Sequence, residues 1–169
     1  RDLNVDYVIV TDASGTVLAR TDSMANGDSV AASKGVAKAL QDVTGTYYEE
    51  GTKTKLAIVS SGPLKDDAGK MIGAVSAVYK LDSPAFLDEL QKVTGSDFTV
   101  FLKDTRINTT IMISNKRQIG TQMDPKVAKT VLEKKQVFEG TVKAFGSTYY
   151  TMYQPIEDEN GEVIGAFLG

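Results

Sequence analysis

Short runs of hydrophobic and β-branched residues recur along the chain, and polar turn sequences separate them. Residues 7–11 and 16–20 are two such runs. They flank Asp12-Ala13-Ser14-Gly15, which places glycine where a positive φ costs little. This pattern predicts a β-hairpin. Further strands are predicted at residues 46–50, 55–61 and 71–80, with a turn at Asp66-Asp67-Ala68-Gly69 between the last two.

Helical periodicity predicts three helices. The first spans residues 29–43, because Val36, Leu40 and Val43 fall on one face and Gly45 suits the position after the helix end. The other two carry start signals, a serine followed by proline and an aspartate followed by proline. They are predicted at residues 83–94, with Gly95 after the end, and at residues 125–135, with Asp124 as N-cap.

The chain contains an internal repeat. The segment PLKDDAGKMIGA at residues 63–74 returns as PIEDENGEVIGA at residues 155–166, which is 92 residues later. Three matches in the same order indicate two copies of one unit, with a boundary near Gly95. The two further matches pair residues 8–12 with 100–104 and residues 36–38 with 127–129.

Each copy has the order strand, strand, helix, strand, strand, strand. An antiparallel sheet with helices packed on one face is the layered arrangement for this order. We predict an α+β fold of two PAS-like modules, each a five-stranded antiparallel sheet with helices on one face. The modules are expected at residues 1–82 and 97–169, with a connecting helix at residues 83–96. The strands of the second copy are predicted at residues 98–103, 107–113, 140–145, 148–154 and 162–168.

The composition excludes several kinds of chemistry. The chain of 169 residues has no histidine and no cysteine, so it cannot form a Ser–His–Asp or Cys–His nucleophile or a zinc site with these ligands. Paired acidic residues occur mainly in predicted turns, where aspartate is favoured by local hydrogen bonding, and they lack the alternation of a calcium loop. We therefore predict no catalytic residues, no metal site, no cofactor and no enzymatic activity.

Charge and hydropathy bear on partners. The net charge is −3 without a basic block, which is unfavourable for binding nucleic acid or an anionic membrane surface. No apolar run approaches the roughly 20 residues needed to span a bilayer. The chain starts at Arg1 rather than methionine and ends at Gly169 after an apolar run. We interpret it as a fragment of a longer protein, which flanking helices anchor in a membrane.

Basic and aromatic side chains inside predicted strands are candidates for a pocket. Arg20 ends an otherwise apolar strand, and Arg106 has a similar place in the second copy. A charge there must reach water or an anion, so a surface ion pair and a ligand contact explain these residues equally well. By alternation Tyr149 and Tyr153 share one strand face and Tyr150 takes the other. Core packing is the favoured interpretation, and a pocket is the alternative.

The run YVIVTDASGTVLART at residues 7–21 resembles the opening of a Cache domain. Residues 105–110, 117–121, 150–156 and 161–165 resemble further parts of that family. In their order and spacing, these segments are similar to the tandem (double) Cache sensory ectodomain of bacterial methyl-accepting chemotaxis receptors. The resemblance covers nearly the whole chain, without the long N-terminal helix that usually precedes the first module.

The resemblance implies a sensor for signal transduction and chemotaxis. The implied protein is an inner-membrane receptor whose sensor part is periplasmic or extracellular, binds a small molecule and forms a homodimer at full length. The first module would be membrane-distal and the second membrane-proximal. Two alternatives stay open: the same domain on a sensor histidine kinase, and an interaction or dimerisation module that binds no ligand.

The resemblance also directs the search for a ligand site to the first module. Related citrate-sensing Cache domains carry arginine and lysine where this chain has Val59 and Ser61, so a tricarboxylate is not expected. One or two cations with several hydroxyls suit a small carboxylate or a zwitterion. The predicted pocket lining is Arg20, Tyr48, Lys55, Ser61 and Ser76, with Tyr47 in place of Tyr48 if the strand parity is off by one.

Overall fold

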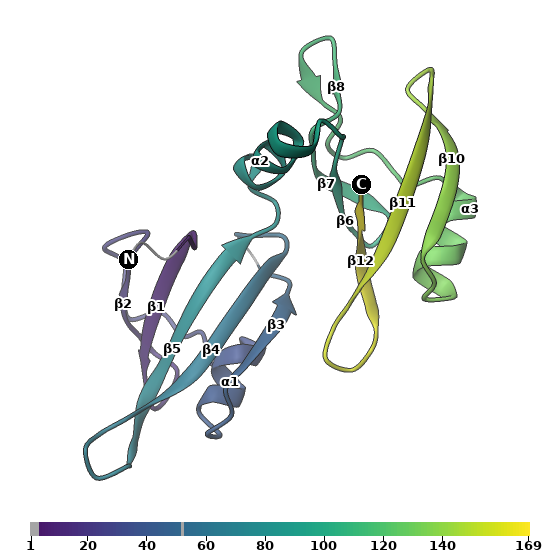
Figure 1. Cartoon of the computed structure of the whole chain (residues 1–169). Coiled ribbons are helices and arrows are strands. Elements are labelled where there is room, and N and C mark those ends of the chain that lie inside the picture. The colour runs from purple at the N-terminus through teal and green to yellow at the C-terminus, as the bar shows by residue number, and fades with distance from the viewer. Residues whose placement is uncertain (1–3, 52) are drawn as a thin grey trace. The chain divides into compact units, whose positions relative to one another are not determined.

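The computed structural model describes residues 4–51 and 53–169. Two compact units make up the chain. Among the described residues, the first comprises residues 4–51 and Ala57–Lys80, and the second comprises residues 53–56 and Leu81–Gly169. Each unit is built on one antiparallel sheet of five strands. Figure 1 labels the strands of both sheets.

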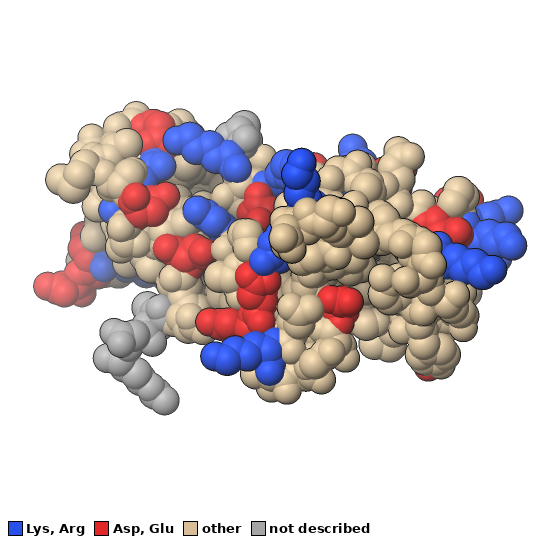
Figure 2. Space-filling model, turned by 90° about the horizontal axis from the view of Figure 1, so that it is seen from above, with Lys and Arg blue, Asp and Glu red and all other residues tan. Residues whose placement is uncertain are grey.

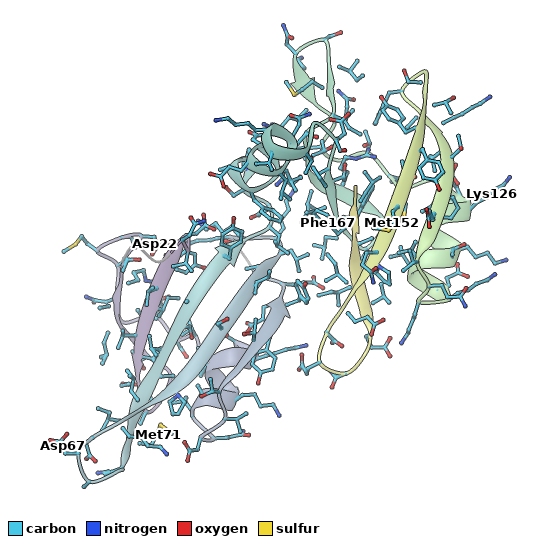
Figure 3. All side chains as sticks on the ribbon, viewed as in Figure 1. Asp22, Asp67, Met71, Lys126, Met152 and Phe167 are labelled. Carbon is cyan, nitrogen blue, oxygen red and sulfur yellow. The ribbon has the colours of Figure 1, made fainter. Side chains whose placement is uncertain are left out.

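The sheet of the first unit has the strand order β2-β1-β5-β4-β3. Its strands agree with the predicted ones in number and order. The β4–β5 turn is a tight one, because Gly69 has a φ of 80° and Asp66 accepts backbone hydrogen bonds from Ala68 and Lys70. Asp67 stands at the tip of this hairpin (Figure 3). The strands are β1 (Tyr7–Asp12), β2 (Val17–Arg20), β3 (Gly45–Glu49), β4 (Ala57–Lys65) and β5 (Met71–Lys80).

One short helix, α1 (Lys34–Ala39), packs on one face of the first sheet. The prediction of a helix over residues 29–43 is wrong at both ends. Ser29 forms a bridge with Thr16, so this segment follows the sheet edge until Ser33 caps the helix. The helix ends at Ala39, and beyond it Asp42 takes a φ of 67°, which prevents the helix from continuing to residue 43.

The second sheet has the order β10-β11-β12-β6-β7. When it is followed from β7, it repeats the topology of the first sheet strand for strand. A small separate hairpin, β8 (Met112–Ile113) with β9 (Lys116–Arg117), lies outside it. The five strands of the sheet are β6 (Thr99–Leu102), β7 (Thr105–Thr109), β10 (Phe138–Ala144), β11 (Ser147–Glu157) and β12 (Val163–Leu168).

The helices of the second unit begin where the sequence predicts. Helix α2 (Pro84–Thr94) ends at Gly95 with a φ of 75°. Asp124 caps helix α3 (Pro125–Ala128) by accepting from two backbone N–H groups. The helix then continues as a π-helical segment, η1 (Lys129–Glu133), so it ends slightly earlier than predicted.

The second unit has the larger hydrophobic core. Side chains from α3 and η1 pack against the inner face of the sheet, with Val127, Val131 and Phe101 fully buried. Figure 3 labels Met152 on strand β11 and Phe167 on strand β12. Acidic and basic side chains are interspersed over the face shown in Figure 2. No helix among residues 4–51 and 53–169 is long and apolar enough to cross a membrane.

Candidate functional site

A cavity of about 220 Å³ lies in the second unit. It opens on the face of the sheet that α3 and η1 cover, and its wall combines apolar, aromatic and charged side chains. This volume is below that of a typical drug-sized pocket, and it suits a small metabolite. The lining residues are Ser96, Asp97, Arg106, Ile111, Val142, Ala144, Tyr149, Tyr150, Thr151, Tyr153, Leu168 and Gly169.

Arg106 supplies the positive charge of this cavity. Strand β7 carries it opposite Phe101, and its backbone N–H donates to the Thr121 carbonyl at 2.9 Å. The residue is only 4% exposed. Its Cζ lies 4.9 Å from the centre of the Phe101 ring and 5.2 Å from that of Phe145. The guanidinium is therefore held in place by strand pairing and by two aromatic rings.

The hydrogen bonding of this guanidinium is incomplete. Nη1 donates to the Thr121 hydroxyl, whereas the buried Nε has no partner. Within the part of the chain that the structure describes, no carboxylate lies within ion-pair distance of Arg106. Burial lowers the pKa of Arg106, but arginine stays protonated at neutral pH. The cavity therefore contains a buried cation that makes no direct ion pair with a described residue, an arrangement that is costly unless an anion binds it.

Tyr153 and Asp97 complete the polar part of the wall. Tyr153 is 3% exposed, and burial raises the pKa of its hydroxyl, so it remains a neutral hydrogen-bonding group. Asp97 Oδ1 accepts from Gln91 Nε2 and from the Thr110 hydroxyl, each at 2.8 Å. The carboxylate is thus fixed from two sides. The cavity presents one cation, one carboxylate and a phenol to whatever enters it.

In the first unit the strand register decides which predicted residues share a face. Arg20, Ile9, Ser76 and Ser61 are successive cross-strand partners, so Arg20, Ser61 and Ser76 face the same side of the sheet. Tyr47 lies two residues from Gly45, the partner of Ser61, and shares that side. Tyr48 therefore faces the other side of the sheet, and Tyr47, the residue given for a parity that is off by one, faces the side of Ser61.

The same register shows that these residues do not meet around one small ligand. Arg20 is on edge strand β2 and Tyr47 on edge strand β3, so about 19 Å of sheet separates the two strands. Arg20 instead forms an ion pair with Asp28. Lys55 precedes β4 rather than lying on it; it is exposed and belongs to the second unit. Its backbone N–H donates to Asp82 at 2.8 Å.

The two buried serines of the first sheet are already hydrogen-bonded to each other. Ser61 and Ser76 are buried and share a hydrogen bond of 2.7 Å. Helix α1 lies directly on them, because a Cβ at Gly35 would stand only 2.4 Å from the Ser61 Oγ. Glu49 also accepts from the Gly35 N–H at 2.7 Å. Little room is left for a ligand between this helix and the serine pair.

A family model, Single cache domain 3, matches residues 79–168, more than half of the chain. The chain belongs to the Single cache domain 3 family. The match contains every lining residue of the cavity except Gly169, and it ends where β12 ends. The Cache match therefore falls on the unit that holds Arg106.

Solved structures share the fold along nearly the whole chain. An extracellular ligand binding receptor from Desulfohalobium retbaense has a TM-score of 0.57 at 17% identity; the match covers 97% of this chain and 30% of that one. The sensor domain of the V. cholerae histidine kinase DctB has a TM-score of 0.57 at 10% identity, covering 97% and 71%. The ligand-binding domain of the Campylobacter jejuni chemoreceptor Tlp3, with L-norvaline, has 0.50 at 14%, covering 98% and 64%.

These matches bear on the function at the level of the family. They include sensor domains of a kinase and of a chemoreceptor, and at these identities they establish a shared fold alone. No curated protein matches this sequence. Cache domains are sensory, ligand-binding modules. Among the described residues there is no group of three or more Asp and Glu placed to hold a metal ion.

Sequence reasoning identified part of the cavity. Arg106, Tyr149, Tyr150 and Tyr153 were singled out as basic or aromatic residues on strands, and all four line the cavity. For the tyrosines the pocket is the alternative to core packing, whereas for Arg106 a ligand contact and a surface ion pair are equally favoured by the sequence. Asp97 carried no signal, because it lies in the loop before β6 and its role depends on hydrogen bonds to α2 and to Thr110.

Proposed function

We propose that this chain is the extracytoplasmic sensor domain of a membrane receptor for chemotaxis, with two Cache modules in tandem. Two observations support the tandem arrangement: the two sheets have one topology, and the fold likeness to solved sensor domains extends over both units. The chain would not act as an enzyme. The family match covers one module, so the first module rests on topology and on the internal repeat.

The ligand is a small carboxylate or a zwitterion, bound in the cavity of the second module. The observation that carries this proposal is Arg106, which is a buried cation with a free Nε and no carboxylate partner among the described residues. Asp97 offers a site for the ammonium group of a zwitterion. The norvaline complex of the Tlp3 domain is an example of an amino acid bound to a domain of this fold.

The proposal also includes the kind of signalling protein to which the sensor domain belongs. A chemoreceptor is favoured by the motif resemblance, and a histidine kinase is the alternative, since solved domains of both kinds share the fold. The sequence that follows residue 169 in the full-length protein decides between them. A homodimer is expected there, with membrane helices flanking the sensor.

The test is a thermal-shift screen of carboxylates, amino acids, amines and purines, followed by titration of any hit. A ligand at one hundred times its Kd should stabilise the protein by about 2.7 kcal/mol. Arg106→Met keeps apolar contacts between the rings and removes the charge, and Arg20→Met is its matched control in the first unit. Loss of charge-assisted hydrogen bonds should weaken an anionic hit about ten- to one-hundredfold in Arg106→Met.

The outcomes separate the possible sites and functions. Retained binding in Arg20→Met with loss in Arg106→Met supports the second module. The reverse result assigns the ligand to the first module and contradicts the proposal. If no compound shifts the wild-type protein, the interaction or dimerisation module becomes the better interpretation. Arg106→Lys, which keeps a charge, provides a second variant if Arg106→Met does not fold.

A further inference from the structure

The two charged residues of the cavity wall lie in different rows of cross-strand partners. Arg106 is opposite Phe101 on strand β6. Asp97 precedes Phe101 by four residues, and the ladder continues towards it, because the Thr110 N–H donates to the Phe98 carbonyl at 2.9 Å. At a rise of about 3.3 Å per residue, roughly 13 Å of strand separates Asp97 from the row of Arg106. The two charges are thus two rows apart in one cavity.

The Arg106 guanidinium is held at its own row. Its Cζ lies 4.9 Å from the centre of the ring of Phe101, its direct cross-strand partner. Nη1 donates to the hydroxyl of Thr121, whose carbonyl accepts from the Arg106 backbone N–H. Because both neighbours lie beside Arg106 itself, its charge does not approach Asp97. Among the described residues, no ion pair joins the two.

Asp97 is fixed at the other end by residues of two elements. Its Oδ1 accepts from Gln91 Nε2, near the end of α2, and from the Thr110 hydroxyl. That hydroxyl in turn accepts from the Phe98 N–H at 2.9 Å. No described residue donates a hydrogen bond to the other carboxylate oxygen, Oδ2. The wall therefore holds an anion in a fixed position, and one of its oxygens is left for a donor that enters the cavity.

The wall between the two charges is uncharged. Leu168 pairs with Tyr153 on one side and with Thr99 on the other. Since Thr99 is two residues from both Asp97 and Phe101, this is the row that lies between the charges. Leu168 and Tyr153 are both buried, and apart from Arg106 and Asp97 no lining residue carries a formal charge. The arrangement suits an apolar chain with opposite charges at its two ends.

The spacing of the charges distinguishes two classes of zwitterion. An α-amino acid holds its ammonium nitrogen about 2.5 Å from its carboxylate carbon, whereas extended 5-aminopentanoate separates these atoms by about 6 Å. With charge-assisted hydrogen bonds of about 2.8 Å at both ends, the first spans about 9 Å between protein atoms and the second about 13 Å. The longer molecule matches the distance between the two rows, and the shorter one does not.

We propose that the cavity binds an ω-amino acid, in which the ammonium group and the carboxylate are at opposite ends of the carbon chain. The carboxylate lies on Arg106, the ammonium group on Asp97, and the methylene chain against Leu168 and Tyr153. This inference rests on the proposed function, and it narrows the ligand from carboxylates and zwitterions in general to zwitterions with separated charges. Gln91 acts through Asp97 as a positioning residue.

Calorimetric titration with two isomers is the direct test. 5-Aminopentanoate and 2-aminopentanoate have the same atoms and differ in the position of the ammonium group, and pentanoate lacks that group. Loss of charge-assisted hydrogen bonds weakens binding about ten- to one-hundredfold, so 5-aminopentanoate should bind at least about ten times more tightly than either of the others. In the unbranched ω-amino acids from glycine to 6-aminohexanoate, affinity should reach its maximum at 5-aminopentanoate or a direct neighbour.

A variant of Asp97 separates the two ends of the ligand. Asp97→Asn removes the charge and keeps an oxygen that can accept the same two hydrogen bonds. It should weaken binding of 5-aminopentanoate about tenfold or more and leave pentanoate unchanged, whereas Arg106→Met should weaken both. Asp88→Asn is the matched control, because Asp88 is a carboxylate of the same unit that pairs with Arg117 and does not line the cavity. It should bind all three compounds as the wild type does.

The comparison of compounds uses the wild-type protein, so it decides the question even if Asp97→Asn does not fold. Equal affinity for the two isomers, or for 5-aminopentanoate and pentanoate, would overturn the inference and leave a carboxylate site on Arg106 standing. Undiminished binding of 5-aminopentanoate to Asp97→Asn would overturn it in the same way. If neither the amino acids nor pentanoate bind the wild type, the proposed ligand site itself fails, and this inference fails with it.

Discussion

The two sheets have one topology but carry different side chains at equivalent positions. Pro63 and Pro155 correspond in the internal repeat, and the register leads from each across its sheet to Val17 in the first unit and to Arg106 in the second. Val17 is 1% exposed and belongs to an apolar core. The second unit thus has a cation where the first has a valine.

The next row of cross-strand partners also differs between the sheets, but here the first unit has the more polar residues. In the first unit it contains a serine pair and a glycine beneath a closely packed helix, and its arginine is on the edge strand with Asp28. In the second unit the row is mostly large and apolar. The shared topology therefore does not locate the proposed ligand site. The row of positions that contains the unpaired charge of Arg106 locates it. The two rows are Arg20, Ile9, Ser76, Ser61 and Gly45, and Thr109, Thr99, Leu168, Tyr153 and Phe138.

The largest expected effect tests whether the two sheets are equivalent. A Cβ at Gly73 would stand 1.9 Å from the Thr11 carbonyl oxygen, and one at Gly165 would stand 2.0 Å from that of Phe101. Because neither strand can yield without losing its partner, Gly73→Ala and Gly165→Ala should each cost about 3 kcal/mol. Hydrogen exchange should show the loss in the mutated unit. A variant with normal protection in its own unit would contradict the equivalence.

Much of the fold could be predicted because its signals are local. The turn glycines Gly69 and Gly161 have φ values of 80° and 75°, as the repeated Asp-x-x-Gly pattern indicates, and Asp158 accepts backbone bonds just as Asp66 does. Strand number and order followed from the same signals. The extent of the first helix did not, because pairing of Ser29 with Thr16 outweighed its helical periodicity.

The site depends on long-range register, which the sequence conveys poorly. The repeat pairs residues 8–12 with 100–104, but the structure places Thr11 opposite Ala74 and Phe101 opposite Ala166. The first strands are therefore two residues out of step with the sequence alignment. A shift of two residues leaves each side chain on the same face of the sheet. Predictions of the face therefore remain correct, whereas predictions of the cross-strand partners do not. Arg20 and Arg106 are not equivalent in the sheets, because Arg20 pairs with Ile9 and Arg106 pairs with Phe101, which lie in different rows.

A second prediction concerns the serine pair of the first unit. Ser61→Ala or Ser76→Ala leaves one buried hydroxyl without its partner, and each should cost about 1–3 kcal/mol in the free energy of unfolding. The double variant should cost less than the sum of the two, because both hydroxyls are then absent. Denaturant titration of the four proteins measures this coupling. Strict additivity would show that the hydrogen bond contributes nothing.

A third prediction follows from the cation without a counter-ion. Replacing Arg106 by methionine removes a buried, unpaired charge and should raise the stability of the second unit by about 1 kcal/mol in the absence of ligand. Arg20→Met removes one partner of an ion pair and should not stabilise the first unit. The denaturation midpoints of both variants provide the comparison. Destabilisation by Arg106→Met would mean that its contacts with the two rings outweigh the cost of burial.

The smallest effect is a difference in alkaline stability between the units. Burial raises the pKa of Tyr153 in the folded protein, so its contribution to stability is present below the ordinary tyrosine pKa of about 10. That contribution is lost as the pH rises through the folded pKa. The equivalent residue of the first unit is Ser61, which does not titrate. Protection from hydrogen exchange should therefore fall in the second unit as the pH rises above about 10, and Tyr153→Phe should remove that part of the fall. Tyr48→Phe, which removes a phenol from strand β3 of the first unit, is the control. An equal alkaline loss in wild type and Tyr153→Phe would show that other groups govern it.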